Sequence, residues 1–117
     1  MIDLSYFIKL SNNKISFLIR VMNVFIDDTP KDIEELQISF NAKNYKKVKE
    51  VCHKLKGLFK SYNMLELTQL TVELENNAKQ ENLGEGSIKL LNQILSNYEI
   101  LKSEMIILRD DYKKSEK

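Results

Sequence analysis

The spacing of apolar residues between positions 44 and 62 restricts this part of the chain to an amphipathic α-helix. Apolar side chains recur there every three or four residues, at Val48, Val51, Cys52, Leu55, Leu58, Phe59 and Tyr62. At about 100° per residue they fall within an arc of roughly 120°, which predicts a buried face. The whole chain has one proline and three glycines, so long uninterrupted helices are expected throughout.

The only histidine of the 117 residues, His53, lies on the opposite face of this helix. It points about 165° away from the centre of the apolar arc, so it is predicted to be exposed. Gly57 follows one turn later on the same face, where glycine costs about 1 kcal/mol of helix propensity relative to alanine. A glycine at such a position indicates the close approach of a partner. The same face carries four lysines, Lys46, Lys49, Lys56 and Lys60.

This combination of side chains suits the chemistry of phosphoryl transfer. A neutral imidazole is a nucleophile, and lysine ammonium groups hold phosphate by charge. An exposed histidine beside lysines and a glycine can therefore capture a phosphoryl group that another protein presents. The same pattern also fits a solvated basic helix face on which the histidine has no special role.

The pentapeptide His53-Lys54-Leu55-Lys56-Gly57 resembles the His-x-x-Lys-Gly signature of the histidine-containing phosphotransfer (Hpt) domains. In that family the signature lies on the second helix of a four-helix bundle. Ten residues after the histidine the family usually has a turn glycine, where this chain has Asn63, and at +21 and +22 it has a pair similar to Leu74-Glu75. Asparagine tolerates left-handed backbone, so Asn63 is expected to keep the turn. The resemblance covers roughly residues 14–108 and departs from the family at residues 58–61, where small residues are common.

The resemblance implies a role for each residue of the site. His53 would take a phosphoryl group from an aspartate and later give it to another aspartate. Lys56 would neutralise the charge of that group, and Gly57 would admit the partner. Glu75 would accept a hydrogen bond from the imidazole and orient the ring. Lys49 and Lys60 would steer an acidic partner surface toward the histidine.

The resemblance also implies partners, namely the receiver domains of a hybrid histidine kinase and of a downstream response regulator. Magnesium would belong to the receiver, so neither a cofactor nor a metal is expected on this chain. The chain would be a phosphocarrier without turnover of its own. Two alternatives remain open at this stage: a helical interaction module that carries no phosphate, and a histidine domain that an ATP-binding kinase domain phosphorylates in trans.

Composition argues against several other classes of protein. The net charge of +1 argues against a nucleic-acid binder, whose surface is usually strongly basic. Cys52 is the only cysteine, so an intramolecular disulfide is impossible, and its place on the apolar arc predicts core packing. No run of 18 apolar residues and no basic-then-apolar leader is present, so a cytoplasmic protein without a membrane span is expected. A monomer is the default for a compact bundle.

Together these patterns predict an all-α fold, an antiparallel four-helix bundle with a short additional N-terminal helix, in a single domain over residues 1–117. Residues 1–10 would form the capping helix, 14–108 the bundle and 109–117 a charged tail, which together with Met1 fits a free-standing protein. Asp28-Thr29-Pro30 is predicted to end one helix and start another, with Thr29 as N-cap and Pro30 at the first helical position. Gly84 is predicted to be a left-handed helix cap, and Ser87 to cap the last helix.

A second apolar stripe lies opposite the core face of residues 14–27. It consists of Phe17, Val21 and Val24, and a helix that is apolar on both sides must be covered on both sides. The helix at residues 1–10 is expected to lie over this stripe. The alternative is that part of the stripe stays exposed beside His53 and docks a receiver domain.

Overall fold

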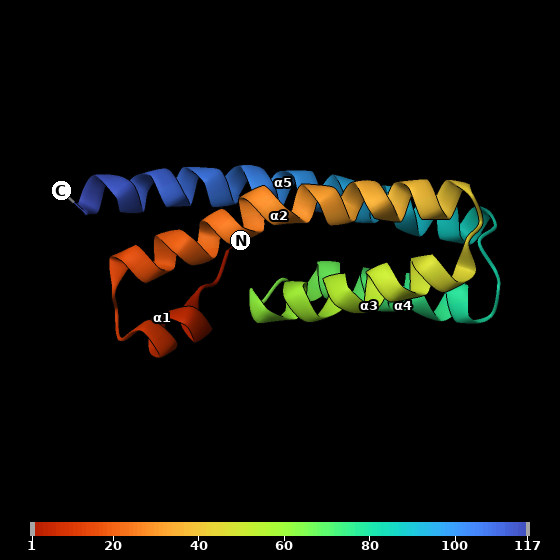
Figure 1. Ribbon diagram of the computed structural model, residues 1–117, viewed down its shortest axis with the longest axis horizontal. Coiled ribbons are helices and arrows are strands. Elements are labelled where there is room, and N and C mark those ends of the chain that lie inside the picture. Colours follow the sequence, from red (N-terminus) through yellow and green to blue (C-terminus); the bar gives the residue numbers. More distant parts are fainter. Residues whose placement is uncertain (1, 117) are drawn as a thin grey trace.

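The computed structural model describes residues 2–116, and within this range the secondary structure consists of five α-helices. They are α1 (Ser5–Ser11), α2 (Ile15–Asn41), α3 (Tyr45–Ser61), α4 (Leu65–Lys79) and α5 (Glu85–Ser115). The long helices α2 and α5 run side by side, and the shorter hairpin of α3 and α4 packs against one part of their length (Figure 1). The short helix α1 folds back beside the end of the hairpin at which the chain turns from α3 into α4 (Figure 1). The predicted four-helix bundle with an extra N-terminal helix is therefore confirmed.

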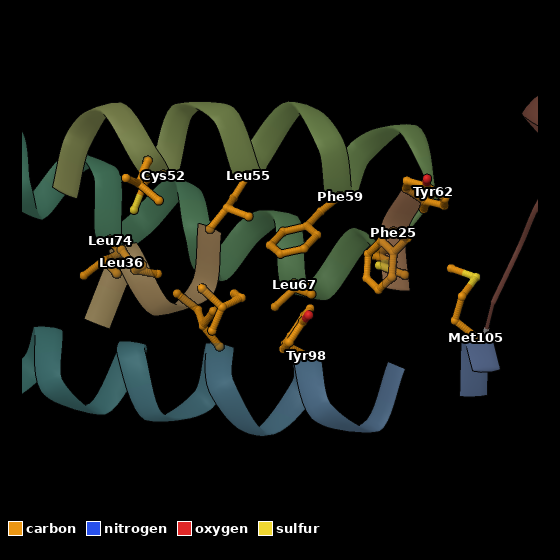
Figure 2. Packing of buried hydrophobic residues seen from close by; sticks show 14 of the residues in the cluster. Phe25, Leu36, Cys52, Leu55, Phe59, Tyr62, Leu67, Leu74, Tyr98 and Met105 are labelled. Atoms are coloured by element: carbon orange, nitrogen blue, oxygen red, sulfur yellow. The ribbon is translucent and has the colours of Figure 1, made fainter. Parts of the chain in front are cut away.

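The core lies between the hairpin and the two long helices. Figure 2 shows that each of the four bundle helices contributes to it, including Phe25 from α2, Phe59 from α3, Leu67 from α4 and Tyr98 from α5. Full burial of an aliphatic or phenyl side chain of this size contributes about 1.5–3 kcal/mol. The predicted buried arc of the 44–62 helix is confirmed in its central members, Val48, Val51, Cys52, Leu55 and Phe59. This burial fixes the rotation of α3 and so decides which residues it presents outward.

The predicted break at Asp28-Thr29-Pro30 is wrong, because α2 continues through Pro30 without interruption. Proline removes the N–H that would bond the carbonyl of Ile26 and costs about 3 kcal/mol inside a helix. Thr29 is not an N-cap: its buried hydroxyl bonds the carbonyl of Phe25 and lies 2.7 Å from the Tyr98 hydroxyl. Apolar residues on both sides of the proline are buried on one face, and their burial keeps the helix continuous.

The turns on either side of α3 each contain a left-handed residue, and the turn after α3 follows the sequence prediction. Asn63 has a φ of 56°, so it provides the left-handed turn residue between α3 and α4. Before α3, Lys43 is also left-handed, with a φ of 53°. Asn44 caps the helix, because its side-chain oxygen accepts a hydrogen bond of 3.1 Å from the Lys47 amide. The short connection at Asn63 makes α3 and α4 antiparallel neighbours, and the one at Lys43 joins α2 to α3.

The predicted caps between α4 and α5 are wrong at both positions. Glu81, with a φ of 55°, is the left-handed residue after α4, whereas Gly84 has a negative φ and directly precedes α5. Ser87 lies inside the first turn of α5 and is buried. Its hydroxyl donates to the Asn82 carbonyl at 2.7 Å and accepts from the Asn77 amide at 3.0 Å. The serine therefore ties the loop to α4 instead of capping α5.

The predicted tail at residues 109–117 is also wrong, because α5 continues to Ser115. Arg109 donates a hydrogen bond of 3.0 Å to Asn23 of α2, and Tyr112 packs partly buried against the core. At the other end, the helix predicted at residues 1–10 begins at Ser5, whose amide donates to the Asp3 carboxylate at 2.9 Å. Met1 and Lys117 lie outside the described residues.

The stripe on α2 is only partly open. Val21 is buried and its carbonyl accepts a 2.8 Å hydrogen bond from the Tyr62 hydroxyl, so the prediction that it offers a docking side chain is wrong. Phe17 is partly buried against the core, and Val24 is 44% exposed. Helix α1 packs on α2, and the ring of Phe7 lies 4.9 Å from that of Tyr62. The covering role predicted for the N-terminal helix fits this packing better than docking does.

Candidate functional site

His53 lies in the middle of α3 with its side chain 74% exposed, as its place on the helix predicts. Its sequence neighbour Cys52 points the other way and is fully buried. Burial, and secondly the negative charge of Glu75, raise the pKa of the Cys52 thiol to about 12. The cysteine is therefore a core residue held as a neutral thiol, whereas the imidazole of His53 faces outward from α3.

Glu75 of α4 lies directly against the histidine. Its Oε2 is 3.3 Å from Nδ1 of His53, and its Oε1 accepts a hydrogen bond of 2.9 Å from Nζ of Lys56. The glutamate side chain is only 4% exposed, so α3 and α4 hold this carboxylate between two partners and away from water. The sequence had predicted the contact between Glu75 and the imidazole but not the one between Glu75 and Lys56.

The surroundings of Glu75 keep it ionised. Burial raises its pKa, but the hydrogen bond and charge of Lys56, the charge of Lys79 and the contact with His53 together outweigh burial, so the pKa lies below its usual value. A carboxylate can only accept hydrogen bonds. The proton of a neutral imidazole is therefore drawn to Nδ1, and the lone pair is left on Nε2. In this tautomer Nε2 is the nucleophilic nitrogen of the ring.

One turn after the histidine, at Gly57, no side chain of the protein covers the surface of α3. A Cβ added to Gly57 would meet no atom within 4 Å, so the glycine is not required for packing inside this chain. Gly57 and Lys60 line a shallow hollow together with Tyr6, Ser61 and Asn63. The first two residues are where the sequence predicted them, on the exposed side of α3 next to His53.

A second open hollow, of 390 Å³, contains the histidine itself. It is lined from α3 by Lys49, Glu50 and His53, and from α4 by Glu75 and Lys79. The place of Lys49 in the site agrees with the sequence prediction, whereas Lys79 was not predicted. The signal was available, because Lys79 follows Glu75 by four residues and so shares its face of α4.

Other lysines of α3 are occupied by carboxylates of α2. Nζ of Lys54 lies 3.0 Å from the Asp32 carboxylate, and Nζ of Lys47 lies 2.6 Å from that of Glu35. The side chain of Lys54 is 69% exposed and that of Lys47 is 44% exposed, and such surface pairs are worth between about 0 and 1 kcal/mol. These pairs orient α3 on α2 but bring no further charge to His53.

Among residues 2–116, no group of three or more histidine, cysteine, aspartate or glutamate side chains is arranged to hold a metal ion. No helix in the same range is long and apolar enough to cross a membrane.

Comparison with known proteins identifies the family to which this arrangement belongs. The model of the Hpt domain family matches residues 20–104, which include all of α3 and α4. The chain belongs to the Hpt domain family. Hpt domains are the phosphocarriers of phosphorelays and interact with receiver domains of response regulators, so this chain has a histidine phosphotransfer role.

The fold of a solved structure agrees with this family. Histidine-containing phosphotransfer protein B (HptB) from Pseudomonas aeruginosa PAO1 matches with a TM-score of 0.84 and 18% sequence identity, covering 95% of this chain and 96% of that one. At this identity the likeness concerns the Hpt fold. No curated protein sequence matches the chain.

Proposed function

We propose that His53 is the phosphoacceptor of this Hpt domain and that Nε2 is the nitrogen that carries the phosphoryl group. The observation that supports this most is the contact of Nδ1 with the buried Glu75 carboxylate, because it directs the proton to Nδ1. His53 is also the only histidine in the chain and is 74% exposed. An exposed nucleophile whose orientation is fixed from beneath is what transfer between two proteins needs.

The transfer step follows from this geometry. The Nε2 lone pair attacks the phosphorus of a receiver's aspartyl phosphate, the bond between phosphorus and the aspartate oxygen breaks, and the aspartate leaves as a carboxylate with that electron pair. The proton stays on Nδ1, so the phosphorylated ring carries positive charge. Glu75 faces that charge and stabilises it. The same steps run in reverse when His53 gives the group to the aspartate of a second receiver.

The partners of this step are receiver domains, and we assign them to a hybrid histidine kinase and a downstream regulator. Gly57 leaves room for a receiver loop beside His53, since nothing in the chain fills the space of its missing side chain. Lys60 adds positive charge to the same side and attracts an acidic receiver surface. Magnesium belongs to the receiver's acidic pocket. The domain acts as a monomeric cytoplasmic carrier without turnover of its own.

Phosphotransfer from a panel of phosphorylated receiver domains tests this proposal. Wild-type protein is expected to gain acid-labile, alkali-stable label, and His53→Gln is expected to gain none. Lys46→Gln is the matched control, because it changes an exposed residue of α3 two turns from the histidine and should keep the label. Equal labelling of wild type and His53→Gln would overturn the assignment.

The same preparations separate the two alternatives. Receiver binding with no label on wild type, from receivers competent to phosphorylate another Hpt domain, would identify an interaction module. Label that appears only with ATP and a kinase domain would identify a histidine domain phosphorylated in trans.

A further inference from the structure

Three lysines surround His53, but they are not equivalent. Lys56 is 29% exposed and its ammonium is bound to Glu75 at 2.9 Å. Lys49 and Lys79 are both exposed, and neither makes an ion pair within residues 2–116. Lys56, the lysine of the His-x-x-Lys-Gly motif, is therefore already paired with a carboxylate, whereas Lys49 and Lys79 are not.

The two uncommitted lysines lie on the same side of the histidine. Lys49 precedes His53 by one turn on α3, and Lys79 follows Glu75 by one turn on α4. Because α3 and α4 are antiparallel, both positions lie toward the same end of the hairpin, opposite to Lys56. Both lysines line the 390 Å³ hollow that contains the histidine, and Lys56 does not.

Extending the proposed function, on which this inference rests, we infer that the phosphoryl group on His53 occupies this hollow between Lys49 and Lys79. Lys56 stays with Glu75 in the phosphorylated state. Moving Lys56 to the phosphoryl group would leave the 4% exposed carboxylate of Glu75 without its cation, and an unpaired buried charge is strongly unfavourable. Lys49 and Lys79 reach a phosphoryl oxygen without breaking any existing pair, because each is a flexible chain with a hydrated ammonium group.

Glu50 lines the same hollow and has the opposite charge. Its carboxylate repels a phosphoryl dianion held there, so it weakens the effect of the two lysines. Substitutions of Glu50 and of the two lysines should therefore change the stability of the phosphoryl dianion in opposite directions. Removing either lysine should disfavour the dianion, and removing the charge of Glu50 should favour it.

The experiment measures the pKa of the phosphoryl group on His53 by phosphorus NMR over a pH titration. The full chain is phosphorylated with phosphoramidate, a small donor that needs no receiver domain. Lys79→Gln and Lys49→Gln are each expected to raise the phosphoryl pKa by roughly 0.2 to 0.7, the range that one exposed ion pair provides. Glu50→Gln is expected to lower it by a similar amount.

Two controls define the comparison. Lys89→Gln changes an exposed lysine of α5 that lines a different hollow, and should leave the phosphoryl pKa unchanged. Lys56→Gln tests the competing arrangement, in which Lys56 leaves Glu75 and pairs with the phosphoryl group. An unchanged pKa in Lys79→Gln, with a rise in Lys56→Gln, would overturn the inference and leave His53 as phosphoacceptor. Absence of any phosphohistidine on the wild type would instead overturn the proposed function.

Discussion

Glu75 connects the histidine to the interior of the molecule. One of its oxygens meets the imidazole and the other meets the ammonium of Lys56, while the side chain itself is almost fully buried. A carboxylate in this position stabilises positive charge on the ring and also requires a permanent cation of its own. Stability and the proposed chemistry are thus linked through a single residue.

We predict that Glu75 makes the stability of the protein depend on acid pH. Because its pKa is lowered by folding, its contribution is present above the unfolded-state value of about 4.3 and is lost as pH falls through the lower folded-state value. Glu75→Gln should cost about 1–3 kcal/mol at neutral pH, since Lys56 loses its anion. The difference from wild type should shrink between about pH 5 and pH 3, as measured by urea unfolding.

Glu73→Gln is the control for this prediction, because Glu73 is an exposed residue on the same helix. The free energy of unfolding of the Glu73→Gln variant should equal that of the wild type at every pH. A constant difference between wild type and Glu75→Gln down to pH 3 would show that Glu75 does not titrate with folding.

We predict that Gly57→Ala stabilises the protein and slows transfer from a receiver. The added methyl meets no atom of the chain, and replacing a helical glycine by alanine is worth about 1 kcal/mol. The same methyl should hold a receiver loop away from His53. Gly86→Ala is the control, since Gly86 is also helical with no neighbour within 4 Å, and it should stabilise without affecting transfer. Equal transfer rates in the two variants would remove the role proposed for Gly57.

Much of the site was predictable at this scale. The position of His53 follows from the apolar arc behind it, and the contact with Glu75 was implied by the family resemblance. Lys79 was not predicted, although its spacing of four residues from Glu75 places both side chains on one face of α4. The partner of Lys56 was not predicted, because it depends on the way α4 lies across α3, which residue spacing within one helix does not specify.

At the scale of helices, α2 shows how packing overrides a local signal. A Thr-Pro pair usually starts a helix, yet here Thr29 and Pro30 lie inside one. The Thr29 hydroxyl joins the Phe25 carbonyl to the Tyr98 hydroxyl of α5, and all three groups are buried. A polar link of this kind fixes the register between the two long helices, because Thr29 is the only hydrogen-bond partner of the Tyr98 hydroxyl among residues 2–116.

We predict that Thr29 and Tyr98 are energetically coupled. Thr29→Val and Tyr98→Phe should each cost about 1–3 kcal/mol, because each leaves the other hydroxyl short of a buried partner. The double variant should cost less than the sum of the two, as measured by urea unfolding. Thr68→Val is a control for loss of a hydroxyl that bonds only within its own helix. Strict additivity would mean that the 2.7 Å contact contributes nothing to stability.

The connections between helices show where sequence prediction works and where it fails. Asn63 was predicted because asparagine has a specific tolerance for left-handed backbone. After α4 the left-handed residue is Glu81 and not Gly84, and nothing in the side chain of a glutamate signals that conformation. Ser87 was misplaced because its hydroxyl bonds the loop and α4, which only the assembled bundle brings together.

At the scale of the whole molecule, the site lies apart from the N-terminal half of α2 and the C-terminal part of α5. The molecule measures 50 Å in its longest direction, and α5 with its 31 residues spans about 46 Å of that. The α3–α4 hairpin, which holds the site, covers only part of this length (Figure 1). The N-terminal half of α2 and the C-terminal part of α5 run on beyond it, with α1 folded beside them (Figure 1).

This separation predicts that shortening α5 weakens the fold but spares the histidine. Removing residues 109–117 deletes the hydrogen bond of Arg109 to Asn23 and the partly buried ring of Tyr112, which lines a hollow with Leu4 and Ile8. The loss should amount to about 1–3 kcal/mol and lower the thermal midpoint by several degrees. Phosphorylation of His53 by a small donor should proceed at the wild-type rate below that midpoint, because α3 and α4 are untouched.

Removing only residues 114–117 is the matched control, since the described side chains among them are exposed. Circular dichroism melting of the three proteins separates the contribution of the packed turns from that of the last charged residues. If residues 109–113 were a tail without a role in packing, both deletions would melt with the wild type. If instead the shorter protein lost phosphorylation while still folded, the end of α5 would have to support the α3–α4 hairpin at a distance, and the two regions would form one mechanical unit.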